Sequence, residues 1–364
     1  MDYMEQALSM AKLALGEVSP NPAVGAVVVK DNEIIGKGYT QPPGSGHAEI
    51  VALEQAGDNA CGAVMYVTLE PCCHYGNTPP CTKSIIEAGI SEVHMSILDP
   101  NPLVNGKGRD ELERTGIKTF LGEGEKKARE INEAYIKFQL TGMPFITVKY
   151  AMSLDGKIAT FSGDSKWISG EESRHFVHNL RYKNDAIMAG VNTVLADDPQ
   201  LTARCGGGRG GTSRKQPLRI IIDGMGLTPV TAKIFSEPGY TIIVIARKAT
   251  QKEKEAYQSV GAEILEIPSK DGYIELKTLM AELGKRQIMS VLVEGGSILF
   301  GSLFDQKLVD KVVAFVAPII IGGENAKTAI GGRGVEKVMD AVKLKILNEE
   351  RFGDDIMFIG YVKE

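Results

Sequence analysis

The sequence predicts an α/β protein built from two domains. The chain has 364 residues, which suits two domains of about 150–200 residues each. Short apolar runs alternate with segments of helical spacing along its length, the pattern of a sheet with helical connections. The segment TGMP at 141–144 combines a glycine with a following proline, which is a helix-stop signal. We therefore expect one domain over 1–143 and a second over 144–364.

Composition narrows the class of protein. Hydrophobic residues make up 43% and charged residues 24%, as in soluble globular proteins. The net charge of −5 and pI near 5.7 argue against nucleic-acid or membrane-surface binding, which favours a basic excess. The start, MDYMEQALSMAKLAL, suits an amphipathic helix and lacks the basic leader of a signal peptide. We expect a cytoplasmic protein with small-molecule partners, and neither nucleic-acid nor membrane partners.

The first domain reads as alternating strands and helices. The expected strands are 23–31, 33–40, 64–70, 92–99 and 118–122, and the expected helices are 47–57, 82–90 and 109–117. This order favours a sheet with parallel strands and helical crossovers. A charged amphipathic stretch at 124–140 is expected to form one helix before the domain boundary.

The second domain repeats the alternation with more strands. The expected strands are 144–153, 185–192, 218–224, 240–247, 262–268, 290–296 and 311–321, with helices at 171–183, 250–259, 273–285 and 299–308 and a hairpin at 344–363. Apolar strands with interposed helices indicate an α/β sheet covered on both faces. The glycine-rich segment 205–216 is expected to be a surface loop, with an RGG-like RNA contact as the alternative.

One short segment, TLEPCCHYGNTPPC at 68–81, contains three of the five cysteines of the chain. A disulfide framework is not expected, because the cysteine count is odd and nothing directs the chain to an oxidising compartment. Clustered thiols in such a protein indicate a metal site instead. Two kinds of zinc site remain open: a closed structural site and a catalytic site with a free coordination position.

The residues around this segment favour the catalytic site. His47, Cys72 and Cys81 offer one imidazole and two thiolates, which leave a fourth position on zinc for water. Zinc lowers the pKa of such a water to roughly 7, and Glu49, two residues from His47, could carry the water's proton to a departing amine. H-x-E followed by P-C-x-x-C is the signature of zinc deaminases. Here eight residues, not two, separate the cysteines.

Other assignments of the same residues stay open. Cys73 could replace its neighbour as a ligand, and His74 could complete a closed structural site in which Glu49 would have no task. The two remaining cysteines are expected to be buried thiols: Cys61 and Cys205.

Eight motifs together resemble one family of bifunctional riboflavin-biosynthesis enzymes. SPNPAVGAVVV, HAE, TLEPCCHYGNTPPC and DPNPLVNGKG resemble its deaminase half, and KYAMSLDGKIAT, SGDSKWISG, VNTVLADDPQLTAR and VEGGSILFGSLF its reductase half. The resemblance covers residues 3–361. It implies a cytidine-deaminase-like α/β/α domain followed by a dihydrofolate-reductase-like α/β domain.

The resemblance also implies the reactions. The first is zinc-dependent deamination of 2,5-diamino-6-(5-phosphoribosylamino)pyrimidin-4-one. The second is NADPH-dependent reduction of the ribosyl side chain of 5-amino-6-(5-phosphoribosylamino)uracil to ribityl. One Zn²⁺ per chain, NADPH and a homo-oligomer are implied with them. Two alternatives stay open: a nucleoside or tRNA deaminase with an appended non-reductase domain, and a non-enzymatic zinc-stabilised binding module.

By resemblance, His47, Cys72 and Cys81 bind zinc and Glu49 is the proton shuttle. The substrate of the deaminase would contact two asparagines: Asn21 and Asn101. Two positions depart from the family pattern, because Asn77 and Thr40 stand where relatives have a basic residue and a histidine. These departures leave open how the phosphate is held, and Lys107 or Arg109 could compensate.

In the reductase half, the resemblance implies a cofactor site and a substrate site. The cofactor residues are Ala151, Trp167, Thr193, Asp197, Gly224, Gly296, Ser297, Ile298, Leu299, Phe300, Gly301 and Ser302. The substrate residues are Ser165, Arg181, Leu201, Arg204 and Glu294. Arginines can grip a phosphate bidentately, and Trp167 in its polar setting suits an exposed stacking face. Asp155 and Glu294 are the candidates for a general acid, and the alternative that the ring-opened ribosylamine needs none stays open.

Overall fold

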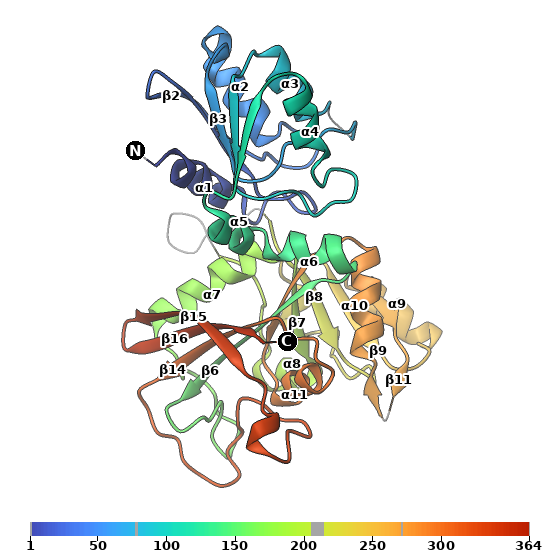
Figure 1. Cartoon of the computed structure of the whole chain (residues 1–364). Helices are drawn as coiled ribbons and strands as arrows, with labels where there is room; N and C mark the ends of the chain where they lie inside the picture. Colours follow the sequence, from blue (N-terminus) through green and yellow to red (C-terminus); the bar gives the residue numbers. More distant parts are fainter. Residues whose placement is uncertain (1, 77–78, 205–214, 271, 364) are drawn as a thin grey trace. The chain divides into compact units, whose positions relative to one another are not determined.

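The computed structural model describes residues 2–76, 79–204, 215–270 and 272–363. The chain divides into two compact units, Met1–Gly142 and Met143–Glu364 (Figure 1). No helix in the described ranges combines the length and the apolar character that crossing a membrane requires. The glycine-rich segment 205–216 lies almost wholly outside the described residues.

The first unit is built on a mixed five-stranded sheet. Its strands are β1 (Gly25–Lys30), β2 (Glu33–Tyr39), β3 (Val64–Val67), β4 (Glu92–Met95) and β5 (Lys118–Leu121), in the order β2-β1-β3-β4-β5. Strands β3, β4 and β5 are parallel, as predicted. Strand β1 runs antiparallel to both neighbours. Asp31 and Asn32, which have positive φ angles, close the tight hairpin between β1 and β2.

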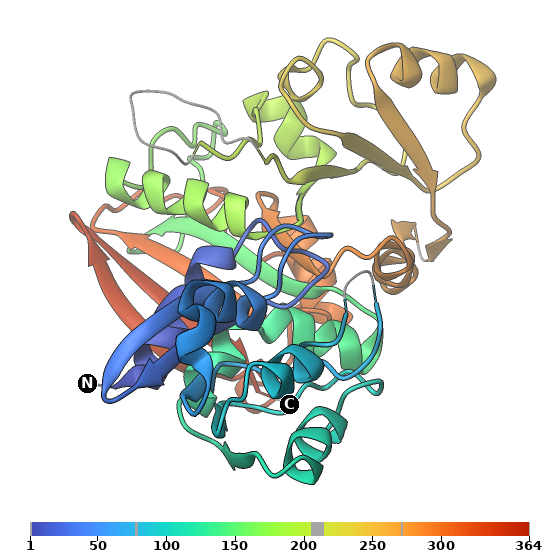
Figure 2. The same ribbon diagram turned by 90° about the horizontal axis from the view of Figure 1, so that it is seen from above.

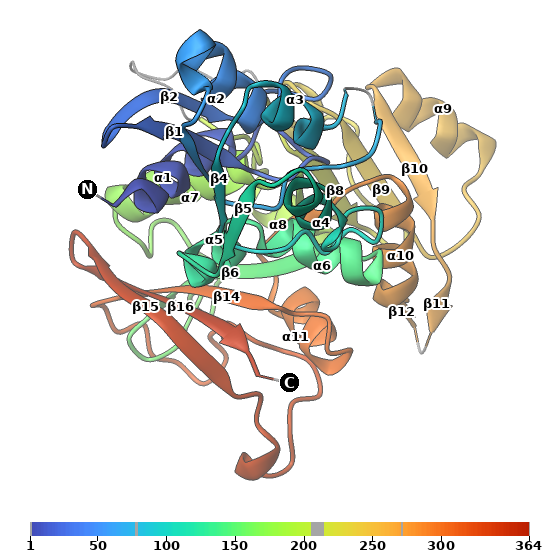
Figure 3. The same ribbon diagram turned by 45° about the horizontal axis from the view of Figure 1, so that its top comes forward.

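Helices cover both faces of this sheet (Figures 1 and 3). They are α1 (Tyr3–Ala14), α2 (Ala48–Ala56), α3 (Cys81–Glu87), α4 (Lys107–Arg114), α5 (Glu125–Ile131) and α6 (Glu133–Thr141). A Cβ at Gly25 would lie 2.0 Å from the carbonyl oxygen of Ala7 in α1, and one at Gly38 would lie 2.1 Å from that of Ala48 in α2. These glycines face opposite sides of the sheet, so each lets one helix approach closely and α2 is fixed at its first turn.

The single helix predicted over 124–140 is wrong, because two helices meet at Asn132. The Asn132 side chain is buried. Its oxygen accepts the Ala23 N–H at 2.9 Å and its amide donates to the Ala23 carbonyl at 3.0 Å. This pairing interrupts the helix and ties it to the segment that carries Asn21.

The second unit is built on a nine-stranded sheet. Its strands are β6 (Phe145–Ser153), β7 (Ala186–Gly190), β8 (Leu218–Ile222), β9 (Thr241–Ile245), β10 (Ala262–Glu266), β13 (Ser290–Glu294), β14 (Lys311–Ala317), β15 (Leu344–Phe352) and β16 (Asp355–Val362). They lie in the order β10-β9-β8-β7-β13-β6-β14-β16-β15. The first seven in that order are parallel, and the C-terminal hairpin adds two antiparallel strands.

Five helices cover the two faces of this sheet. They are α7 (Glu171–Lys183), α8 (Val191–Asp197), α9 (Gln251–Ser259), α10 (Leu276–Lys285) and α11 (Ser297–Asp305). Helices α10 and α11 pack over one core cluster, and α7, α8 and α9 contribute to clusters on the other face. Figure 2 shows α9, in gold, beside the strands at one edge.

One helix and one pair of short strands in the second unit were not predicted. Helix α8 follows β7 directly in a segment that reads as the end of a strand. The short strands β11 (Ser269–Lys270) and β12 (Tyr273–Ile274) pair with each other, so α10 begins later than the predicted 273 because the residues before it are used in this pair.

Candidate active sites

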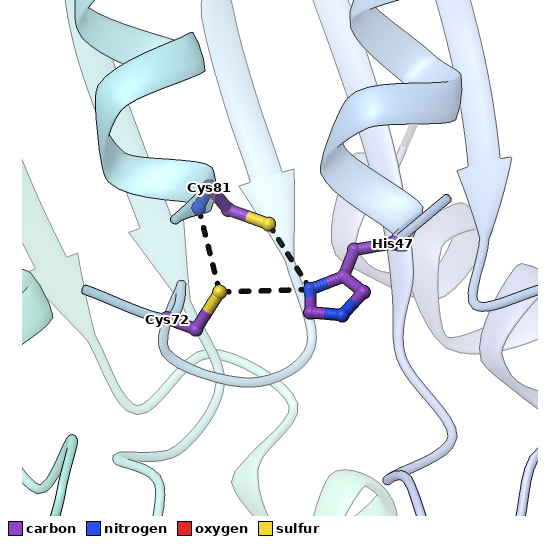
Figure 4. A group of neighbouring side chains, drawn as sticks. All are labelled: His47, Cys72 and Cys81. Carbon is purple, nitrogen blue, oxygen red and sulfur yellow. Dashed lines mark hydrogen bonds between the residues drawn. The ribbon is translucent and has the colours of Figure 1, made fainter. Parts of the chain in front are cut away.

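Three ligand atoms converge in the first unit (Figure 4). His47 Nδ1 lies 3.2 Å from Cys81 Sγ and 3.5 Å from Cys72 Sγ. A tetrahedral zinc ion with usual bond lengths holds nitrogen and sulfur ligands about 3.6 Å apart, so the three side chains fit zinc. Among the described residues, this is the one such group of His, Cys, Asp and Glu ligand atoms.

Secondary structure explains why the three ligands meet. His47 is the N-cap of α2, and Cys81 is the first residue of α3. Cys72 lies in the segment after β3, and the Cys81 N–H donates to its sulfur at 3.4 Å. Two helix N-termini therefore point at the cluster, and their positive dipole ends favour thiolates.

The electrostatics of the cluster suit a metal. The hydrogen bond between the two thiols lowers the pKa of Cys72, although burial opposes the shift, and the same contact raises the pKa of Cys81. The hydrogen bond to Cys72 raises the pKa of His47 to about 9. The thiolate is the form that binds zinc, and the imidazole releases its proton when a metal takes its place.

The other cysteines and His74 lie outside this cluster. Cys73 Sγ points to the Leu103 carbonyl at 3.8 Å, and neither Cys73 nor His74 belongs to the ligand group. Cys61 is exposed, so the expectation of a buried thiol is wrong there. Cys205 lies outside the described residues.

Glu49 stands in the first turn of α2, beside the cluster but not part of it. Its side chain is buried, with 4% exposed. Burial is the main cause that raises the pKa of Glu49 to about 7. A carboxyl group with a pKa near neutrality can both accept and return a proton at working pH.

A cavity of about 320 Å³ opens at this cluster. Besides His47, Glu49 and Cys72, its lining includes the following polar residues: Asn21, Thr40, Ser45, Glu70, His74, Asp99, Asn101, Tyr135 and Gln139. Both predicted substrate asparagines are therefore brought to the cluster.

Asp99 and Tyr135 were missed from the sequence. The Tyr135 hydroxyl donates to Asp99 Oδ1 at 3.0 Å, and both side chains are buried. Burial raises the pKa of Asp99 to about 6. Asp99 precedes the noted asparagine in DPNP, but nothing local to the sequence indicates that a tyrosine in α6 reaches it.

The positions that depart from the family pattern supply no cation to this cavity in the described residues. Thr40 is buried and its hydroxyl accepts the Val24 N–H at 3.1 Å, while Asn77 lies outside the described residues. Lys107 donates to the Pro102 carbonyl and Arg109 to Glu113 and Thr119, and neither residue lines the cavity.

The second unit contains a larger cavity of about 960 Å³. All five predicted substrate residues line it. So do ten of the predicted cofactor residues: Ala151, Trp167, Thr193, Asp197, Gly296, Ser297, Ile298, Leu299, Phe300 and Ser302. Gly224 and Gly301 are not in the lining. Gly301 instead packs on backbone, since a Cβ there would lie 2.3 Å from the Gly331 carbonyl oxygen.

The glycine pair at 295–296 closes one wall of this cavity. Both residues have positive φ angles, 76° and 95°. A Cβ at Gly295 would lie 2.8 Å from the Thr193 side chain of α8. A residue with a side chain would therefore be strained at these two positions. The pair leads into α11, whose N-terminus suits a phosphate group.

Glu294 is the charged centre of the cavity, with 7% of its surface exposed. Arg181 Nε and Nη2 donate to its two oxygens at 2.6 and 3.0 Å, and Lys149 Nζ lies 3.8 Å away. Burial would raise the pKa of Glu294, but Arg181 and Lys149 outweigh it and lower the pKa to about 2. Glu294 is thus an ionised group that orients cations.

Lys149 was missed from the sequence. It is the direct cross-strand partner of Glu294 in the β6–β13 pair, and burial lowers its pKa. The sequence does show a lysine at the start of the apolar stretch KYAMS, but the family resemblance gave this lysine no role. Asp155, the other candidate acid, is exposed, accepts the N–H groups of Ile321 and Gly322, and does not line the cavity.

The mouth of the cavity carries an aromatic and a cationic group. Trp167 is 70% exposed, as predicted, and the Arg174 guanidinium lies 4.6 Å from its ring. Arg204 is exposed and donates to Thr202 Oγ1 at 3.3 Å. Arg181 differs from Arg204, because its guanidinium donates to the Thr202 carbonyl at 3.1 Å in addition to the Glu294 carboxylate. Its donors are therefore used by protein groups.

Comparison with known proteins matches both units. The family model described as RibD C-terminal domain matches residues 144–358. The model described as cytidine and deoxycytidylate deaminase zinc-binding region matches residues 1–97.

Whole proteins match along the full chain. The riboflavin biosynthesis protein RibD of Actinobacillus pleuropneumoniae is 40% identical and covers 100% of this chain and 95% of its own length. That of Aquifex aeolicus is 42% identical, with 98% and 96% covered. The structure of Acinetobacter baumannii RibD superposes with a TM-score of 0.88 at 37% identity, covering 100% of this chain and 98% of that one. A Thermotoga maritima structure named diaminohydroxyphosphoribosylaminopyrimidine deaminase/5-amino-6-(5-phosphoribosylamino)uracil reductase gives 0.86 at 35% identity, with 99% and 98% covered.

Proposed function

Because the chain belongs to the RibD family of riboflavin-biosynthesis proteins, we propose which of its residues carry each of the family's two reactions. It is a bifunctional enzyme, a zinc-dependent pyrimidine deaminase and an NADPH-dependent reductase. Its folds are the cytidine-deaminase-like and dihydrofolate-reductase-like α/β folds expected from the sequence. The alternative of a tRNA or nucleoside deaminase with an appended non-reductase domain is not supported, because the second unit matches the RibD reductase domain.

We assign deamination to the first unit and reduction to the second, with the boundary at residue 143. The deaminase removes an exocyclic amine of the diaminopyrimidine ribosyl phosphate as ammonia and leaves a carbonyl. The reductase then converts the ribosyl group of the uracil product to ribityl. The observation that supports this assignment is that each unit contains its own cavity lined by buried glutamates, Glu49 and Glu70 in the first unit and Glu294 in the second.

For deamination, His47, Cys72 and Cys81 are the ligands that would hold zinc. When bound, zinc supplies the Lewis acidity that lowers the pKa of a water to roughly 7. Glu49, buried beside the ligands with a pKa of about 7, accepts the proton of the attacking water and delivers it to the leaving amine. Asn21 and Asn101 bind the substrate in the cavity.

For reduction, the residues that line the larger cavity would hold NADPH, which when bound would supply the hydride for C1 of the ribosyl group. The Lys149 ammonium, whose pKa burial lowers, donates a proton to the ring oxygen as the C1–O bond breaks. The exocyclic nitrogen that joins the pyrimidine to the sugar then forms a double bond to C1. This C1 is the electrophile that would accept the hydride. Glu294 holds Lys149 in place, Arg181 holds Glu294, and Arg204 at the mouth binds the phosphate.

The test is a stepwise assay with purified protein. Incubated with the diaminopyrimidine ribosyl phosphate alone, the enzyme releases ammonia and accumulates the uracil compound. NADPH added afterwards is oxidised as the ribityl product forms. NADPH oxidation on the diaminopyrimidine without ammonia release would contradict the proposed order.

We also propose that the enzyme is a homo-oligomer in the cytoplasm, acts on small molecules and has no nucleic-acid partner. The family resemblance and the acidic pI of 5.7 support this. Light scattering of the purified protein gives the oligomeric state, and a mass equal to the 39.3 kDa chain would contradict it.

A further inference from the structure

Glu70 lies between strand β3 and the metal-ligand segment, and the reaction as described leaves it without a role. Its side chain is 3% exposed and is not part of the ligand group. The carboxylate accepts three backbone N–H groups. Oε2 accepts those of Asp99 at 3.1 Å and Gly106 at 2.9 Å, and Oε1 accepts that of Arg109 at 3.0 Å.

The three donors belong to one segment, which connects β4 to α4 and includes the first turn of that helix. This segment supplies Asp99 and Asn101 to the deaminase cavity. Within it, the Asn101 N–H donates to Asp99 Oδ1 at 2.9 Å, and the Leu103 N–H donates to Asn101 Oδ1 at 3.0 Å. The Asn101 amide is thus oriented by the backbone of its own turn, and that turn is held by Glu70.

The same glutamate is joined to the metal ligands through the chain. Pro71 and Cys72 follow it directly. A Cβ at Gly108 would lie only 2.2 Å from the Pro71 carbonyl oxygen, so the first turn of α4 packs on the backbone of the metal-ligand segment. The segment that contains Asp99 and Asn101 and the segment that contains Cys72 are therefore in contact at Glu70.

We propose that Glu70 is a positioning residue of the deaminase, which sets the place of Asn101 and Asp99 relative to the metal ligands. It lines the cavity but is not among the metal ligands, and in this proposal it acts through the backbone N–H groups that it binds. The inference rests on the proposed deaminase function of this cavity. Since a misplacement of about 1 Å can cost about 10²-fold in rate, loss of these contacts affects turnover without removing any group that performs chemistry.

The direct test is Glu70→Gln, which keeps the shape of the side chain. One carboxylate oxygen becomes an amide that faces a backbone donor, so at least one contact is lost. We expect deaminase kcat/KM to fall about 10- to 100-fold, with one zinc per chain retained and reductase kcat/KM unchanged. Wild-type deaminase kcat/KM in this variant would overturn the proposal.

A matched control is Asp185→Asn in the other unit. Asp185 Oδ2 likewise accepts two backbone N–H groups, from Met289 at 2.9 Å and Ser290 at 3.2 Å. This variant loses a comparable contact and should keep wild-type deaminase kcat/KM. An equal deaminase loss in both variants would show a general stability effect and overturn the specific role of Glu70.

A double-mutant cycle with Asn101→Ala separates positioning from direct action. If Glu70 acts through the Asn101 segment, Glu70→Gln lowers the kcat/KM of the Asn101→Ala enzyme by no more than about threefold, because the two residues are coupled. Two losses that multiply would overturn the proposal.

If Glu70→Gln does not fold, Gly108→Ala tests the same contact from the helix side. Its Cβ would push α4 away from Pro71, and the same deaminase loss with zinc retained is expected. Unchanged deaminase kcat/KM in Gly108→Ala would overturn the proposal. Absence of deamination in the wild-type enzyme would instead refute the proposed function itself.

Discussion

Each cavity has one buried glutamate to which we assign a part in the reaction, Glu49 in the first unit and Glu294 in the second, and their pKa values shift in opposite directions. Glu49 is 4% exposed and Glu294 is 7% exposed. Burial raises the pKa of Glu49 to about 7, whereas Arg181 and Lys149 overcome the effect of burial and lower the pKa of Glu294 to about 2. At similar burial, the pKa of Glu49 is raised because burial and the neighbouring Cys72 thiolate outweigh the effect of His47, whereas Arg181 and Lys149 outweigh burial at Glu294.

This difference matches the chemistry assigned to each unit. Deamination needs a group that takes a proton from water and returns it to nitrogen, which a carboxyl group with a neutral pKa can do. Reduction needs a proton donor at the ring oxygen, and the ionised Glu294 serves by holding Lys149, whose pKa burial lowers. Variants that change one active site and leave the other intact test this difference.

The largest effect is expected from Glu49→Gln. The amide cannot carry a proton, so deaminase kcat should fall by about 10³-fold, while zinc content and reductase activity stay at wild-type values. Ammonia release on the diaminopyrimidine substrate and NADPH oxidation on the uracil substrate measure the two halves separately. Deamination at the wild-type rate would show that Glu49 is not the proton carrier.

A loss of about 10²-fold in reductase kcat is expected for Lys149→Met, because the proton donor is removed. The wild-type reductase rate should fall on the alkaline side as Lys149 loses its proton, at a pH below the ordinary lysine pKa since burial lowers it. Lys149→Arg keeps the positive charge but cannot release a proton, so it should lose about as much reductase kcat as Lys149→Met and show no alkaline decline in its residual rate. A persistent decline in Lys149→Arg would assign it to another group.

A smaller effect is expected at the mouth of the reductase cavity. Arg204→Gln should raise the reductase KM for the phosphorylated substrate about tenfold, because one charge-assisted phosphate contact is removed, with kcat close to wild type. Arg174→Gln is the comparison, since that guanidinium packs on Trp167. If the dephosphorylated substrate shows the same change in KM, Arg204 does not bind the phosphate.

The smallest effect concerns Asp99, whose pKa burial raises to about 6. The protonated form is favoured in the folded state, so its contribution to stability is present below the unfolded pKa and is lost as pH rises through about 6. Between about pH 5 and pH 8 the wild type should therefore lose about 1 kcal/mol of unfolding free energy from this group. Asp99→Asn should lack that loss, as chemical unfolding at both pH values can show; an identical pH dependence would contradict the shift.

The sequence was most informative where a function depends on local spacing. His47, Glu49, Cys72 and Cys81 lie at the starts of helices or beside a strand end, so short motifs identified them, and the structure brings them together. The alternation of strands and helices likewise predicted most of both sheets.

What the sequence could not show depends on contacts between distant segments. Lys149 meets Glu294 because β6 and β13 pair in a particular register, although the two residues are far apart in the chain. The break at Asn132 follows from a hydrogen bond to Ala23, and Tyr135 in α6 reaches Asp99 in the segment between β4 and α4. Each is a long-range polar contact without a local pattern, and so each was missed.

The central claim, that two separate sites act in succession on one chain, is tested most directly by mixing two inactive variants. Glu49→Gln alone and Glu294→Gln alone should each fail to convert the diaminopyrimidine substrate and NADPH into the ribityl product. An equimolar mixture should restore product formation, because one variant releases the uracil intermediate and the other reduces it. No product from the mixture, although each variant retains the activity of its intact half, would contradict the account.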